Sequence, residues 1–123
     1  MSFMTDRKRA IGLGSAKTGT DHHWSMMVSS AALLILMPLF LFTFGYALGK
    51  PYEEVIAYYS QPLPALIAAL TFGVGLYHFK GGVQVLIEDY TAGFTRKLLI
   101  VVMSCISIAL AAAGIFAVAR IAI

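Results

Sequence analysis

Three long apolar runs, separated by short polar links, dominate the sequence. The runs cover approximately residues 25–48, 63–87 and 98–119. Each supplies the roughly 20 apolar residues that a helix needs to cross a hydrocarbon core of about 30 Å. Backbone polar groups inside a bilayer must bond within their own segment, which favours helices. The pattern predicts an all-α integral membrane protein with three transmembrane helices in one membrane domain, residues 25–123.

The stretch before the first run, residues 1–24, is polar and contains Gly12, Gly14 and Gly19. These glycines argue against a long regular helix, so we expect a lead that lies on the membrane surface or on a partner. A cleavable signal peptide is the alternative, but the apolar run begins about twenty residues in and has the length of a full span. We therefore expect a retained first helix, kinked at Pro38.

The composition supports a membrane protein, since 59% of the residues are hydrophobic and only 12% are charged. Soluble domains carry about a quarter charged residues. The formal charge is +3, but the basic residues lie at the ends of apolar runs rather than in a nucleic-acid patch. A single cysteine, Cys105, excludes an internal disulfide and a cysteine metal cluster.

The distribution of lysine and arginine predicts the orientation. Six precede the first run or lie in the second link, and two lie on the other side: Arg7, Lys8, Arg9, Lys17, Arg96 and Lys97 against Lys50 and Arg120. The positive-inside rule then places the N-terminus and the second link in the cytoplasm. The first hairpin, residues 49–62, is expected outside, with its tyrosines at the membrane interface.

The second run is the candidate functional helix because it contains His78 and Lys80 well inside its apolar pattern. His78 lies roughly 15 Å from the polar end of this run. Three glycines lie within about 60° of it on a helical wheel, namely Gly75, Gly81 and Gly82. Such a face suits a flat macrocycle whose iron the imidazole binds, and it equally suits close helix packing.

Two further clusters flank the runs. Glu88, Asp89 and Tyr90 end the second run, where Tyr90 is either an interfacial residue or a donor to a lipid-soluble carbonyl compound, with carboxylates relaying protons. His22 and His23 precede Trp24 before the first run and lack the third ligand of a zinc site. We interpret Trp24 as an interfacial anchor and the histidines as surface groups that can contact an anionic partner.

Two segments resemble a known family. Residues 77–90 read YHFKGGVQVLIEDY, and residues 12–24 read GLGSAKTGTDHHW. The first is similar to the second helix of the hydrophobic membrane anchor of succinate dehydrogenase, respiratory complex II, where Asp-Tyr follows a histidine at eleven and twelve residues. The second is similar to the stretch before the first helix in alphaproteobacterial members. The resemblance covers nearly the whole chain.

This resemblance implies that the chain pairs with the other membrane anchor of the complex, here called the partner anchor, and that the two hold a haem b between them. His78 would be one axial ligand of the haem iron, and the partner anchor would supply the other. Tyr90 would bind ubiquinone, and Asp89 would lie at the edge of that site and assist proton delivery. The chain would anchor the flavoprotein and iron–sulfur subunits, which carry FAD and the clusters, in the bacterial inner membrane, and would itself contain no succinate-oxidising site.

The sequence departs from the family at Met27, where many relatives carry an arginine near the haem propionates and the quinone pocket. The propionates would then need another partner, such as His22, Lys17 or the partner anchor. Two alternatives stay open. One is the anchor of a quinol-fumarate reductase or another b-type cytochrome, and the other is a haem-less structural subunit in which His78 only packs.

Overall fold

The computed structural model describes residues 5–12 and 19–123, and all of its regular structure is helical. The helices are α1 (Asp6–Ile11), α2 (Gly19–Ala47), α3 (Tyr52–Tyr59), α4 (Pro62–Tyr90) and α5 (Gly93–Ala122). Helices α2, α4 and α5 are long and apolar enough to cross a membrane. The prediction of an all-α protein with three membrane helices is confirmed.

The three long helices contain 29, 29 and 30 residues. At about 1.5 Å per residue each is roughly 44 Å long, which exceeds a hydrocarbon core of about 30 Å. Helix α2 begins at Gly19 rather than near residue 25, so His22 and Trp24 lie in its first turns. The expectation that residues 1–24 contain no part of a long regular helix is therefore wrong from Gly19 onward. The preceding helix α1 is short, and Gly12 follows it with a positive φ of 41°. The domain boundary at residue 25 stays a prediction.

The first link contains a short helix that the sequence did not lead us to expect. Gly49 turns the chain with a φ of 79°, and Pro51 stands at the N-cap of α3. Tyrosine rings gather here, with Tyr46 and Tyr58 centroids 4.7 Å apart. The Lys50 ammonium lies 3.5 Å from the Tyr46 ring centroid. Cation–π and ring contacts thus close the α2–α3 turn.

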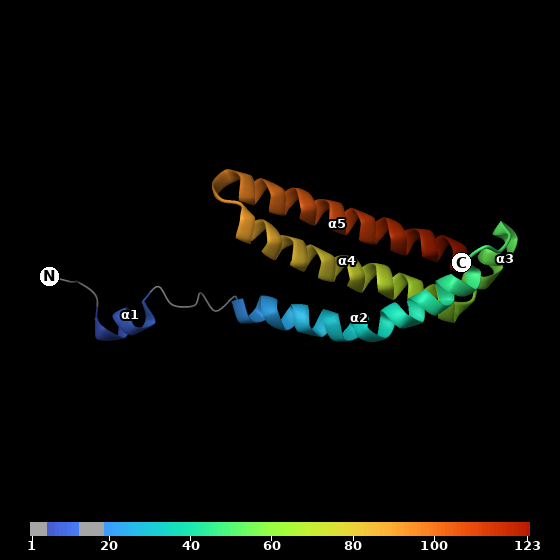
Figure 1. The fold of residues 1–123 in the computed structure, drawn as a ribbon, viewed down its shortest axis with the longest axis horizontal. Coiled ribbons are helices and arrows are strands. Elements are labelled where there is room, and N and C mark those ends of the chain that lie inside the picture. Colours follow the sequence, from blue (N-terminus) through green and yellow to red (C-terminus); the bar gives the residue numbers. More distant parts are fainter. Residues whose placement is uncertain (1–4, 13–18) are drawn as a thin grey trace.

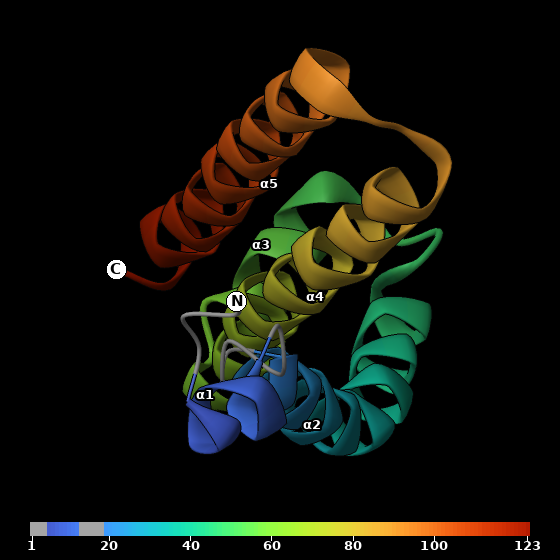
Figure 2. The ribbon, with the colours of Figure 1, turned by 90° about the vertical axis from the view of Figure 1, so that its left-hand side faces the viewer.

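Helix α4 is the centre of the bundle. It packs against both α2 and α5, whereas the described residues of α2 and α5 make no backbone contact with one another. Figure 1 shows that the start of α2, the end of α4 and the start of α5 share one end of the molecule, and Figure 2 shows α4 between its two neighbours. Helix α2 contains Pro38 and visibly changes direction along its length, as a proline inside a helix predicts (Figure 1).

Small residues make the contacts between helices. The buried cluster consists of Ala65, Ala68 and Val118, with Phe40 and Tyr59 packed around it. Large side chains point outward instead, and Leu34 and Phe42 are examples of strongly exposed ones. A bundle that buries alanine and exposes leucine and phenylalanine is suited to lipid or to partner helices.

Candidate functional site

The candidate site lies where α2 crosses the half of α4 that is predicted to face the cytoplasm. His78 is half-buried there, and its Nδ1 atom lies 2.9 Å from the Oγ atom of Ser29. Ser29 is one of few buried polar residues, with 5% of its surface exposed. The bond connects α2 with α4 across 49 positions of sequence. It therefore holds the imidazole toward α2.

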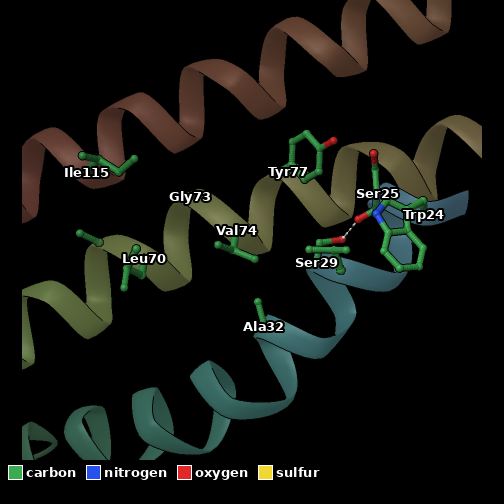
Figure 3. A pocket seen from close by; sticks show the side chains of 11 residues that line it. Trp24, Ser25, Ser29, Ala32, Leu70, Gly73, Val74, Tyr77 and Ile115 are labelled. Atoms are coloured by element: carbon green, nitrogen blue, oxygen red, sulfur yellow. Dashed lines mark hydrogen bonds between the residues drawn. The ribbon is translucent and has the colours of Figure 1, made fainter. Parts of the chain in front are cut away.

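The surroundings of the Ser29 hydroxyl determine which ring nitrogen of His78 carries the proton. Oγ lies 2.8 Å from the Ser25 carbonyl oxygen, a bond drawn in Figure 3, and 3.0 Å from that of Met26. Carbonyl oxygens only accept, and a hydroxyl has one hydrogen to donate. If that hydrogen pointed to Nδ1, no proton would lie between Oγ and either carbonyl oxygen. We assign the hydroxyl hydrogen to the Ser25 carbonyl, the nearer of the two, and the proton of the ring to Nδ1, which then donates to Oγ.

This assignment leaves Nε2 of His78 with a free lone pair. Within the described residues Nε2 has no hydrogen-bond partner, and the atom is not fully buried. The two ring nitrogens point in widely different directions, so Nε2 faces away from Ser29. A histidine whose one nitrogen donates a hydrogen bond and whose other is free is the usual arrangement of a metal ligand.

The glycines beside His78 contribute to helix packing. A β-carbon built at Gly81 would overlap the Met26 sulfur and lie 3.6 Å from the His22 ring. One at Gly75 would make ordinary contact with Leu33, 3.9 Å away. The sequence left macrocycle binding and helix packing open for this face. In the structure Gly75 and Gly81 pack against α2, so any bound group must approach from the Nε2 side.

His22 lies on the side of α2 that faces α4 and is half-buried, whereas the sequence predicted a surface group. Its Nε2 atom is buried without a hydrogen-bond partner in the described structure. It lines a small cavity of about 50 Å³ together with Lys80, Gln84 and Ser25. Lys80 is half-buried there, toward the same end of the bundle. Imidazole, ammonium and amide groups together suit an anionic or strongly polar guest. His23, next in sequence, is exposed.

A larger hollow of about 610 Å³ opens between α2 and α5 over the middle of α4. Its floor includes Gly73 and Val74 of α4, and its walls include Ala32 of α2 and Ile115 of α5 (Figure 3). Trp24 and Tyr77 also line it. No sequence pattern predicts this hollow, because it forms where α2 and α5, which make no backbone contact along their described lengths, both pack on α4.

The residues at the end of α4 are separate from His78. Tyr90 is the last residue of α4 and is 82% exposed, and Asp89 is exposed beside it. Twelve residues of helix separate Tyr90 from His78, which is about 18 Å along the axis. The sequence predicted that these residues belong to one helix, and the structure places all of them on α4. They do not line one cavity within the described part of this chain.

The link after Tyr90 is held by two hydrogen bonds that the sequence did not reveal. The Thr91 hydroxyl donates to the Ile87 carbonyl over 2.6 Å, and Nε of Arg96 donates to the Thr91 carbonyl over 2.7 Å. Gly93 follows with a φ of 62° at the start of α5. Arg96 thus fixes the backbone next to Tyr90.

Comparison with known proteins agrees with this architecture. Residues 1–116 match the model of the succinate dehydrogenase/fumarate reductase transmembrane subunit family. The succinate dehydrogenase hydrophobic membrane anchor subunit of Paracoccus denitrificans, an alphaproteobacterium, is 46% identical over 98% of this chain and 93% of its own. The chain belongs to this family of succinate dehydrogenase membrane anchor subunits.

Two further relatives share less of the sequence. The anchor subunit of Rickettsia bellii is 36% identical over 94% of each chain, and that of Rickettsia conorii is 29% identical over 85% of this chain and 86% of its own. No solved structure matches the chain significantly. As a family member the chain is the membrane anchor of an enzyme complex and not its catalytic subunit. The resemblance of residues 12–24 and 77–90 to this family is confirmed.

Proposed function

We propose that this membrane anchor contributes one axial ligand, His78, to a haem b and one wall, at Tyr90, to a ubiquinone-reducing site. Succinate would be oxidised on the flavoprotein, and electrons would reach the quinone through the iron–sulfur subunit that this chain helps to dock. The complex would serve the tricarboxylic acid cycle and aerobic electron transport. The observation that carries the proposal is the 2.9 Å bond between Ser29 and Nδ1 of His78, because it occupies one ring nitrogen and leaves Nε2 as the nitrogen available to a metal.

The donor set fits a haem that is shared with a partner chain. No group of three or more potential metal-ligating side chains is found among the described residues. One histidine cannot provide both axial positions, so the partner anchor would supply the second. A haem b provides reversible one-electron chemistry when it is bound. This chain would hold its own imidazole in the correct tautomer and exclude water with α2.

His22 and Lys80 are the groups of this chain suited to haem propionates. Both line the small cavity: His22 lies seven residues before Ser29 on α2, and Lys80 lies two residues after His78 on α4. Met27, where many relatives carry arginine, is 50% exposed on another side of α2. The departure at Met27 therefore leaves the α2–α4 contact intact, and within that contact Lys80 can supply a positive charge and His22 a hydrogen bond.

Tyr90 is suited to ubiquinone because its phenol is exposed at the end of a membrane helix. A hydroxyl there can donate to a quinone carbonyl. Asp89, exposed beside it, can deliver protons from the cytoplasmic side. The partner anchor and the iron–sulfur subunit would complete the site, since the described residues of this chain enclose neither side chain.

The proposal assumes that the shared end of α2, α4 and α5 faces the cytoplasm of a bacterial inner membrane. Arg96 and Lys97 begin α5 at this end, whereas Arg120 lies near the opposite end. This distribution supports the positive-inside orientation. Anchoring a quinol-fumarate reductase is the alternative function, because the helices alone do not determine the direction of electron flow.

An optical spectrum of the purified complex tests the haem ligand. Wild-type complex should show a low-spin b-type signal, and His78→Ala should abolish it or convert it to high spin. A low-spin spectrum that survives His78→Ala would exclude His78 as ligand. A complex that assembles without any haem would favour the haem-less anchor instead.

A further inference from the structure

We infer that Ser29 is a positioning residue for His78: it fixes the tautomer and the ring orientation of the imidazole and sets how strongly Nε2 donates to iron. This inference rests on the proposed ligation by His78. Ser29 itself would touch neither the haem nor the quinone. It would act through one hydrogen bond between two membrane helices.

Ser29 is buried between α2 and α4, where its hydroxyl can act on His78. All but 5% of its surface is buried by α2 and α4, and its Oγ lies 2.9 Å from Nδ1. The adjacent Ser30 makes the same kind of bond to its own helix, 2.8 Å to the Met26 carbonyl, yet it is exposed and does not contact His78. The bond that crosses to α4 is therefore the main difference between the two serines. That difference provides a matched control.

The contacts of the Ser29 hydroxyl favour one tautomer of His78. With its hydrogen directed to a carbonyl of α2, Oγ accepts from Nδ1–H. The opposite tautomer, with the proton on Nε2, would place two lone pairs against each other and would block the nitrogen that faces outward. Ser29 thus selects the tautomer that can bind a metal before any metal arrives.

The same bond should tune the bound iron. A hydrogen bond from Nδ1–H to an acceptor raises the basicity of the ligating nitrogen and stabilises the ferric state. A neutral hydroxyl is a weaker acceptor than the carboxylate often found in this role, so it raises basicity moderately. Loss of the acceptor leaves Nδ1–H unpaired in an apolar contact and weakens donation from Nε2.

The test compares Ser29→Ala, Ser29→Thr and Ser30→Ala in the assembled complex. We expect Ser29→Ala to raise the midpoint potential of the haem and to shift its low-spin electron paramagnetic resonance signal. Ser29→Thr keeps the hydroxyl and should restore both values. Ser30→Ala should resemble the wild type. Should Ser29→Ala fail to assemble, Ser29→Cys provides a weaker acceptor of similar size and should shift both values in the same direction by less.

The outcomes separate this inference from the haem proposal. If the signal depends on His78 but neither Ser29→Ala nor Ser29→Cys changes the potential or the resonance, ligation stands and the role of Ser29 is refuted. Equal shifts in Ser29→Ala and Ser30→Ala would also refute it, because they would reflect general loosening of α2. A spectrum unaffected by His78→Ala would refute ligation and the role of Ser29 together.

Discussion

The ring of Phe72 lies directly against Gly114, so closely that a β-carbon at Gly114 would be 2.8 Å from the nearest ring atom. Atoms this close must shift, and the nearest one is Cγ at the base of the ring rather than the far end of a flexible side chain. This contact sets how closely α4 and α5 approach.

Gly114→Ala should therefore destabilise the protein. Overpacking a helix contact costs about 1–3 kcal/mol, measurable as a lower thermal midpoint of the detergent-solubilised complex. Gly45→Ala is the control, since no atom lies within 4 Å of its β-carbon position and alanine favours a helix. Equal stability of the two variants would show that Phe72 can move aside.

Tyr90→Phe should slow succinate:quinone turnover while electron transfer to a water-soluble acceptor stays unchanged. Removal of one hydrogen bond costs about 0.5–1.5 kcal/mol, which corresponds to roughly a two- to tenfold slower rate. Tyr52→Phe is the control, because Tyr52 is 78% exposed at the opposite end of the molecule. Loss of both activities in Tyr90→Phe would instead indicate failed docking of the iron–sulfur arm.

His22→Ala should weaken haem retention more than His23→Ala. Only His22 has a buried, unpartnered ring nitrogen beside Lys80 in the described structure, whereas His23 is exposed. The haem-to-protein ratio after prolonged dialysis in detergent measures the difference. Similar ratios in the two variants would remove His22 from the propionate surroundings.

Cysteine labelling should determine the orientation of the chain in the membrane. Cys105 is the only cysteine of the sequence, so Cys105→Ser gives a clean background. A membrane-impermeant maleimide added to intact spheroplasts should label Glu53→Cys in α3 and should spare Ala92→Cys in the α4–α5 link until the membrane is opened. The reverse pattern would place the N-terminus outside.

The sequence predicted the three membrane helices well, because about 20 apolar residues in a row have few other uses. It also pointed to His78 and Tyr90, which belong to one helix and so keep a known spacing. Ser29 was missed because a lone serine in a membrane helix gives no signal by itself. Its importance depends on how α2 is rotated against α4, and local spacing does not report that rotation.

The role of the glycines near His78 also depends on how the helices are rotated against one another, which the sequence does not report. A helical wheel places Gly81 on the face of His78, but it does not say which neighbour occupies that face. The structure places Met26 and His22 there. The early start of α2 was likewise hidden, since Gly19 and the polar residues after it weaken a helical pattern that later contacts with α4 stabilise.

The separation of α2 from α5 along their described residues has a consequence for assembly. During synthesis α2 enters the bilayer first and finds no long helix of its own chain to pack on until α4 follows. Helix α5 can then loosen without breaking the bond between Ser29 and His78, because that bond belongs to the α2–α4 pair. The protein therefore consists of two helix pairs that share α4, and the pair that holds His78 is complete once α4 has packed on α2.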